Sequence, residues 1–313
     1  MATIIANPIY DSVFKFLMED KRAAMIILTD LLQREVVDVE IKNNEYTKKL
    51  NSEITVLRID FSAKVKDNKG NIENVNIELQ KAWLTTEIMR FRKYLAQQYQ
   101  SDNNRFIIQD KPMQEKSLHM VNIYLLGHNV ENLSLPVTYV YPRLFDQFGT
   151  PINNEIRNID FINELVHDMI IVQIPKISKM SVKTRLDKLL TLFDQAQRWE
   201  NDHQLKVDET TYADEHKHVL NRLIYAKADE EICKDMDFED EFQTILERWE
   251  QNETNMKEQL ASKDKLLEKQ NEQLSEQKTM LRNSILLLKS TNMTNEEIAQ
   301  KLNIAIDKIE ELL

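Results

Sequence analysis

Apolar and polar residues alternate in two neighbouring segments, residues 54–65 and residues 75–83. Successive side chains of a β-strand point to opposite faces, so this alternation predicts two strands that each have one apolar and one polar face. The turn DNKGN between them predicts an antiparallel hairpin. The predicted apolar face consists of Leu57, Ile59, Phe61, Ala63, Val65, Val75, Ile77 and Leu79.

The rest of the first half completes an α/β pattern. Residues 11–33 place apolar side chains at helical spacing, with Asp11 as the predicted N-cap, and a second helix is predicted over about residues 85–100. Residues 117–128 form a nearly continuous apolar run, as expected of a buried central strand, and residues 165–177 predict one more strand. A hairpin combined with helix-flanked strands predicts an α/β fold.

The second half is predicted to be helical, because neither proline nor glycine follows Pro175. Amphipathic helices are predicted over residues 181–202 and residues 218–232. Farther on, leucines recur every seven residues, at Leu260, Leu267, Leu274, Leu281 and Leu288. Placed at heptad position d, they leave polar residues at position a, namely Lys257, Asp264, Asn271 and Lys278. This weak heptad pattern predicts either a marginal parallel dimer or a single solvated helix.

The end of the chain resembles a helix-turn-helix, because a capping box from Thr294 to Glu297 begins two short predicted helices. The second of these carries Asp307, Glu310 and Glu311 against one Lys308. A recognition helix approaches phosphates, so this charge pattern favours packing or assembly over reading of DNA.

These patterns predict four regions in order. Residues 1–175 form an α/β core, and residues 176–244 form a helical extension. Residues 245–289 form a long helix with the leucine heptads, and residues 290–313 form the small tail.

Composition excludes several classes of function. Gly70, Gly127 and Gly149 are the only glycines and lie too far apart for a phosphate-binding or dinucleotide-binding loop, and no serine lies in a nucleophile elbow. Cys233 is the only cysteine, so neither a disulfide nor a thiolate metal cluster is expected. No apolar stretch suits a membrane span and the start shows no secretory signal, which predicts a cytoplasmic protein without a membrane partner.

Charge is distributed unevenly along the chain. The formal net charge is -11, which disfavours nonspecific nucleic-acid binding by the whole molecule. However, the first 145 residues hold 19 Lys and Arg against 18 Asp and Glu, and the remainder holds 22 against 34. The acidity therefore lies in the second half, and a local basic groove in the first half is compatible with the sequence.

The polar face of the predicted hairpin carries candidate chemistry. If the hairpin is symmetric about Lys69, the numbers of facing residues sum to 138, and Asp60 lies opposite Glu78. Facing carboxylates repel each other, whereas a divalent cation such as Mg²⁺ binds one or two carboxylates together with water and phosphate oxygens. Such a cation could activate water for phosphodiester hydrolysis. The alternative is a solvent-facing polar surface on a half-exposed hairpin.

The helix predicted after the hairpin presents a second candidate surface. Arg90, Tyr94 and Gln97 recur at helical spacing with Lys93 beside them, so this face could hold DNA phosphates. Alternatively, Tyr94 packs in the core while Arg90 extends its charged end to solvent.

An ordered set of motifs resembles the bacterial recombination-promoting nucleases, often described as PD-(D/E)XK nuclease-family transposases. The motifs are DSVFKFL near the start, RIDF on the first strand, a glycine-containing turn, IELQ on the second strand and R-x-x-x-Y in the next helix. The resemblance covers most of residues 7–200. It implies a restriction-endonuclease-like core, with a mixed sheet flanked by helices, and Mg²⁺-dependent cleavage of DNA in recombination, mobile-element movement or defence.

Carried over by residue, the resemblance makes Asp60 and Glu78 metal ligands, with the backbone carbonyl of Leu79 as a further candidate. Gln80 stands where the wider superfamily has the lysine of its D…ExK pattern, and this subfamily commonly has glutamine there. A neutral amide can orient water but supplies no positive charge, so Lys64 on the polar face is the candidate to supply it.

Two further positions follow from the motifs. Lys81 cannot replace the missing lysine, because its side chain should point to the other face. In the opening motif, Asp11 is more simply an N-cap and Phe14 a core residue, whereas Lys15 could contact DNA.

The sequence thus predicts a metal-dependent DNA endonuclease with a helical, self-associating second half. Asp60 and Glu78 hold the cation, Gln80 orients the water, and DNA is positioned by Lys15, Arg90, Lys93 and Tyr94. The alternatives are a DNA-binding or assembly protein with weak hydrolysis on a nuclease-like scaffold, and an RNase that uses the same metal site.

Overall fold

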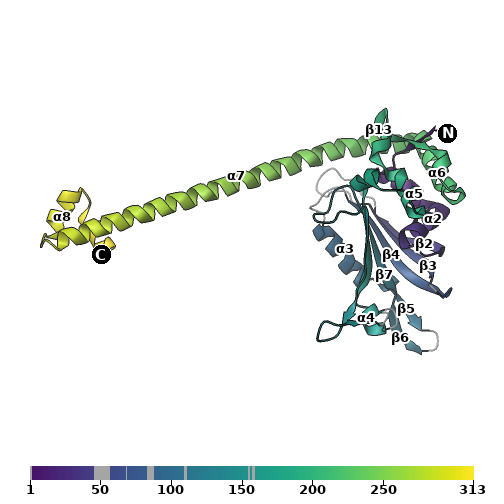
Figure 1. The fold of residues 1–313 in the computed structure, drawn as a ribbon, viewed down its shortest axis with the longest axis horizontal. Helices are drawn as coiled ribbons and strands as arrows, with labels where there is room; N and C mark the ends of the chain where they lie inside the picture. Colours follow the sequence, from purple (N-terminus) through teal and green to yellow (C-terminus); the bar gives the residue numbers. More distant parts are fainter. Residues whose placement is uncertain are drawn as a thin grey trace. The chain divides into compact units, whose positions relative to one another are not determined.

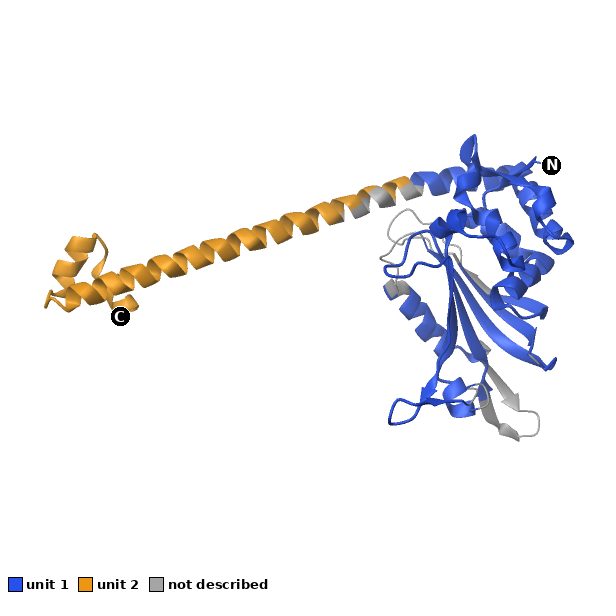
Figure 2. Cartoon of the chain, viewed as in Figure 1, with its two compact units in different colours: residues 1–242 blue, residues 243–313 orange. Residues whose placement is uncertain are grey.

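The computed structural model describes residues 2–45, 57–67, 69–82, 88–108, 111–153, 156 and 159–313. The chain forms two compact units, Met1–Phe242 and Gln243–Leu313 (Figure 2). The boundary predicted after residue 175 falls inside the first unit, whereas the boundary predicted after residue 244 lies close to the division between the units.

A six-stranded mixed sheet forms the centre of the first unit (Figure 1). Its order is β2 (Val36–Glu45), β3 (Leu57–Lys66), β4 (Ile72–Ala82), β7 (His119–Leu126), β11 (His167–Gln173) and β8 (Val137–Val140). The strands β2, β3 and β4 are antiparallel neighbours, β4, β7 and β11 are parallel, and β8 is antiparallel to β11. The predicted α/β fold with a mixed sheet is confirmed.

Helices α1 (Asp11–Glu19) and α2 (Lys21–Leu32) cover the apolar face of this sheet. The sequence predicts one helix here, but Asp20 has an extended backbone and its side chain accepts a hydrogen bond from the Ala23 backbone N–H. Asp20 therefore ends α1 and caps α2. Phe14 is fully buried in the resulting core, as predicted.

Helix α3 (Ile88–Gln100) covers the other face, so α2 and α3 lie on different sides of the sheet (Figure 1). The ring of Phe91 packs against Tyr124 with 4.9 Å between ring centroids. Gln98 accepts a hydrogen bond from the amide of Asn76 at 2.9 Å. The polar face of the hairpin therefore lies beneath a helix.

A second sheet pairs the first strand of the chain with strands close to residue 200. Its order is β1 (Ala2–Ala6), β13 (Asn201–Asp208) and β12 (Arg198–Trp199), and β1 pairs with β13 in antiparallel register. The amphipathic helix predicted over residues 181–202 is wrong: only α5 (Arg185–Leu190) is α-helical there, and short 3₁₀ turns and β12 follow. The chain then forms α6 (Lys217–Ala228).

Smaller elements complete the first unit. Among the described residues these elements include two short strand pairs and one turn of α-helix, namely β5 (Arg105–Ile108) with β6 (Lys111–Ser117), β9 (Leu144–Phe145) with β10 (Pro151–Ile152), and α4 (Asp160–Asn163). Within the described ranges, no helix is both long enough and apolar enough to cross a membrane.

The second unit contains most of α7 (Glu230–Lys289), followed by α8 (Asn295–Leu302) and α9 (Ile306–Leu312). The predicted capping box is confirmed, since Thr294 and Glu297 each bond the other's backbone N–H. Leu281 and Leu288 pack against a small core of Ile285, Ile298, Ala299 and Ile309. Leu260, Leu267 and Leu274 instead remain 60%, 55% and 52% exposed. The leucine repeat is therefore divided between an internal core and an exposed stretch of helix.

Candidate functional site

Two carboxylates face each other on the central strands. Asp60 of β3 pairs with Glu78 of β4, as the predicted register requires, and Arg58 pairs with Gln80. On the other side of β4, Glu78 lies beside Asn122 of β7. Even-numbered residues of β4 share one face with these neighbours, so three adjacent strands contribute polar side chains to one place.

The part of this polar face around the two carboxylates is buried. Asp60 is 5% exposed, Glu78 1% and Gln80 0%, because α3 covers them. The alternative of a solvent-facing surface is therefore wrong for these three residues. Burial of carboxylates is unfavourable unless a cation and hydrogen bonds compensate their charge.

Arg58 supplies that charge in this structure. Its guanidinium donates to both carboxylate oxygens of Asp60, from Nε at 3.1 Å and from Nη2 at 2.8 Å. The same Nε lies 3.2 Å from Oε1 of Glu78. Arg58 thus contacts both members of the carboxylate pair. The sequence places Arg58 two residues before Asp60 and therefore on the same face of the strand. The alternation of apolar and polar residues does not by itself indicate that Arg58 pairs with the carboxylates.

Two side chains of α3 contact the guanidinium group of Arg58. The guanidinium carbon lies 4.7 Å from the centre of the Tyr94 ring, and Nη1 donates to Oε1 of Gln97 at 3.3 Å. A ring face attracts a cation, and this attraction strengthens when both groups are removed from water. Tyr94 therefore contacts the arginine of the site, whereas Lys93 is exposed on the same helix. The side chain of Arg90 lies outside the described part of the structure.

Two amide side chains complete the surroundings. Gln80 donates from Nε2 to Oε1 of Glu78, and Asn122 donates to the hydroxyl of Tyr124 at 3.3 Å. The oxygens Oε1 of Gln80 and Oδ1 of Asn122 are buried and have no hydrogen-bond partner among the described residues. Burial raises the pKa of the Tyr124 phenol, and the nearby charge of Glu78 adds to this effect.

Three other predicted residues lie apart from the carboxylates. Lys64 follows Asp60 by four residues, or about 13 Å along a strand, is 55% exposed and lies 3.5 Å from Asp38. Leu79 points its side chain into the apolar core, which leaves only its backbone carbonyl as a candidate ligand. Lys15 is on α1, on the opposite side of the sheet from Asp60. Among the predicted site residues whose side chains the structure describes, Asp60, Glu78, Gln80 and Tyr94 therefore lie together.

A second buried cluster lies on the opposite face of β4. Lys81 points to that face, as predicted, where its ammonium lies 2.5 Å from Asp11 and donates to the carbonyl of Ile9. Both oxygens of Glu239 accept bonds from the backbone N–H groups of Asp11 and Ser12. The N-cap role predicted for Asp11 is therefore wrong, because Glu239 satisfies the start of α1 instead.

Burial changes the acidity of this second cluster. It raises the pKa of Glu239 to about 7, with a contribution from the negative charge of Asp11 and an opposing one from Lys81. Burial likewise raises the pKa of Asp11, and the charge of Lys81 opposes the rise.

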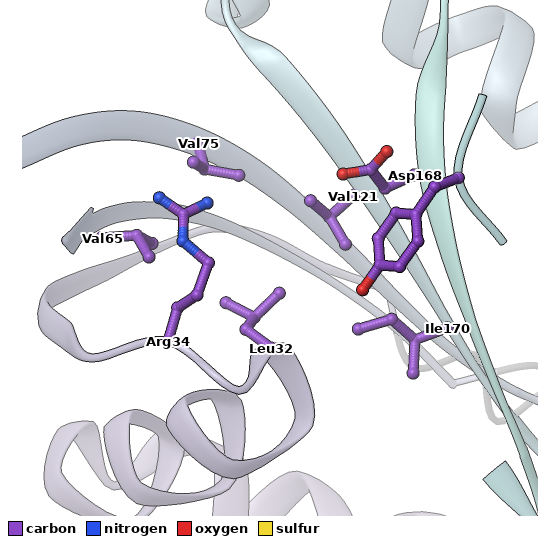
Figure 3. Close-up of a pocket in the computed structure, with 8 residues that line it drawn as sticks. Leu32, Arg34, Val65, Val75, Val121, Asp168 and Ile170 are labelled. Atoms are coloured by element: carbon purple, nitrogen blue, oxygen red, sulfur yellow. The ribbon is translucent and has the colours of Figure 1, made fainter. Parts of the chain in front are cut away.

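A small cavity lies on the apolar face of the sheet (Figure 3), and neither Asp60 nor Glu78 lines it. Its volume is about 40 Å³, and its lining includes Leu32, Arg34, Val65, Val75, Val121, Asp168 and Ile170. This volume holds only a few water molecules at most. The cavity is therefore too small for a nucleotide.

Metal-binding geometry and known proteins give no independent assignment. Within the described ranges, no group of three or more His, Cys, Asp and Glu side chains is placed to hold a metal ion. The pair Asp60 and Glu78 contains only two such side chains, so it does not form a group of this kind. Neither a protein-family model, nor a curated protein, nor a solved structure matches the chain.

Proposed function

We propose that the chain is a metal-dependent DNA endonuclease whose divalent cation is held by Asp60 and Glu78. The observation that carries this proposal is the direct pairing of two buried carboxylates on neighbouring strands. Like charges in this arrangement are destabilising, so the pair needs a cation. The ordered motifs that resemble recombination-promoting nucleases include both residues.

The donor atoms fit a hard cation such as Mg²⁺. Mg²⁺ prefers oxygen ligands and usually combines one or two carboxylates with water and phosphate oxygens. Besides Asp60 and Glu78, the amide oxygens of Gln80 and Asn122 are buried there without a hydrogen-bond partner among the described residues. When bound, the cation would polarise the phosphate and stabilise the charge of the transition state.

The side chains of the chain itself have separate roles in this proposal. Asp60 and Glu78 bind the cation, and Gln80 orients Glu78 through its amide N–H while its oxygen accepts a bond from water. Lys93 and Tyr94 of α3 contact the DNA backbone. Because α3 covers both carboxylates, it must move away from the sheet before a phosphodiester can reach them.

One observation favours a second candidate function. Arg58 already contacts both carboxylates, so the cluster also exists as a buried ion pair without any metal. A DNA-binding or assembly protein with weak or absent hydrolysis would need no more than this. The two candidates differ in whether a divalent cation binds and whether DNA is cut.

Nicking of supercoiled plasmid by the full chain tests the proposal. We expect nicking with Mg²⁺, none with EDTA, and none for Asp60→Asn, while Asp38→Asn retains activity. Asp38 is a matched control, because it is a half-exposed aspartate on a strand of the same sheet. A structured RNA in the same assay tests the RNase alternative. Equal results for wild type, Asp60→Asn and EDTA would favour the second candidate.

A further inference from the structure

Arg58 occupies the position that a metal cation would need. Its Nε bonds Asp60 at 3.1 Å and lies 3.2 Å from Glu78, so one guanidinium group interacts with both carboxylates. A metal ion that binds the same carboxylate oxygens must displace the guanidinium of Arg58, because those oxygens cannot bind both cations in this arrangement.

The contacts around Arg58 fix the conformation of its side chain. It is 4% exposed, and besides its two bonds to Asp60 it contacts Tyr94 and Gln97 of α3. Arginine suits this position because its planar fork binds a carboxylate at two points and its face stacks on an aromatic ring. Arg58 thus links the carboxylate pair to the helix that covers it.

The amide oxygens near the pair are not used by Arg58. Gln80 Oε1 and Asn122 Oδ1 remain without hydrogen-bond partners among the described residues, although Arg58 lies against the same face. A buried acceptor without a partner is unfavourable, and a cation with several oxygen ligands could satisfy such acceptors. The site is therefore only partly satisfied when arginine fills it.

We infer that Arg58 is the resident cation of the Asp60–Glu78 site and competes with the divalent metal for it. This inference rests on the proposed function, because it concerns the same metal site. When a metal ion must displace a bound side chain, its apparent affinity is its intrinsic affinity multiplied by the fraction of molecules in which the site is free. Arg58 therefore keeps metal affinity low until the guanidinium leaves the carboxylates.

Direct Mn²⁺ binding to the full chain, measured by titration calorimetry, tests this inference. We expect Arg58→Met to bind Mn²⁺ at least about tenfold more tightly than wild type, because the competitor is gone. Arg58→Lys keeps the charge but loses the two-point contact, so its affinity should fall between them. The affinity gained in Arg58→Met should disappear in the Arg58→Met, Asp60→Asn double variant.

Thermal unfolding supplies a second readout that does not depend on activity. Arg58→Met leaves two buried carboxylates uncompensated, so it should unfold at a lower temperature than wild type without metal and regain much of the loss with Mn²⁺. Arg34→Met is the matched control, because it removes an arginine paired with Glu73 at 2.6 Å elsewhere in the unit. Mn²⁺ should not restore the stability of that variant.

The outcomes separate this inference from the proposed function. If Arg58→Met and Arg58→Lys bind Mn²⁺ no more tightly than wild type, while Asp60→Asn weakens binding, Arg58 is not a competitor and the metal site stands. If no variant binds Mn²⁺, both ideas fail. If Arg58→Met does not fold, Arg58→Lys decides, and unchanged affinity in that variant overturns the inference.

Discussion

Two buried charge clusters lie on opposite faces of β4, and their comparison separates a candidate site from a structural contact. On one face Arg58 compensates Asp60 and Glu78, and on the other Lys81 lies against Asp11 near Glu239. Each cluster contains one cation and two carboxylates. Burial of charged groups alone therefore does not identify a functional site.

The clusters differ in what their atoms are used for. Glu239 accepts the first backbone N–H groups of α1, and Lys81 donates to a backbone carbonyl, so that cluster completes the ends of elements. In the Arg58 cluster the contacts join side chains of β3, β4 and α3 to one another, and two amide oxygens remain without partners among the described residues. The Arg58 cluster therefore offers two amide oxygens to an additional ligand, whereas beside Glu239 the hydroxyl of Ser12 is buried without a hydrogen-bond partner among the described residues.

The largest effect is expected from Lys81→Met. Removal of the ammonium leaves Asp11 and Glu239 buried without their cation, which should lower the free energy of unfolding by about 3–5 kcal/mol. Denaturant unfolding measures this loss. Mn²⁺ should not restore it, in contrast to Arg58→Met, and restoration of Lys81→Met by Mn²⁺ would remove the distinction between the clusters.

A smaller effect is expected from the pH dependence of Glu239. Because its pKa is raised to about 7, the folded protein retains a proton that the unfolded chain releases near the ordinary value of 4.5. The free energy of unfolding should therefore fall, by about 3 kcal/mol, as pH rises from about 4.5 to about 7. This contribution is fully present below pH 4.5.

Comparison with Glu239→Gln isolates that contribution. Glutamine does not titrate, so the unfolding free energy of the variant should change less across this pH window than that of wild type. Asp11, whose pKa burial also raises, contributes a slope of the same sign in both proteins. Identical pH profiles for wild type and variant would show that Glu239 has no such role.

The smallest effect is expected from Tyr94→Leu. Loss of the ring beneath Arg58 removes a cation–π contact of about 0.5–1 kcal/mol, so Mn²⁺ affinity should rise roughly two- to fivefold. Phe91→Leu is the control on the same helix, because Phe91 packs against Tyr124 instead. Equal Mn²⁺ affinities for the two variants would show that the ring of Tyr94 does not help Arg58 to compete with the metal ion.

Local sequence patterns predict the part of the site that depends on one hairpin. Alternation and the turn place Asp60 opposite Glu78 and Lys81 on the other face, and the structure has this register. These features depend on strand geometry over about ten residues, which the sequence displays directly.

Features that depend on distant partners are not visible in the same patterns. Glu239 caps α1 across more than two hundred residues. The end of the helix predicted over residues 181–202 instead forms β12 and the start of β13, because β12 and β1 both pair with β13. The burial of the polar face likewise depends on how α3 packs. Polar residues on a strand therefore indicate a shared face, but not whether water or a helix covers it.

The central claim is that Asp60 and Glu78 hold a divalent cation for phosphodiester cleavage. The most direct measurement is nicking of supercoiled plasmid with Mg²⁺ by wild type, Asp60→Asn and Asp38→Asn, each verified as folded by circular dichroism. We expect nicking by wild type and Asp38→Asn, and loss of nicking in Asp60→Asn. Undiminished nicking by Asp60→Asn, or no nicking by wild type, would contradict it.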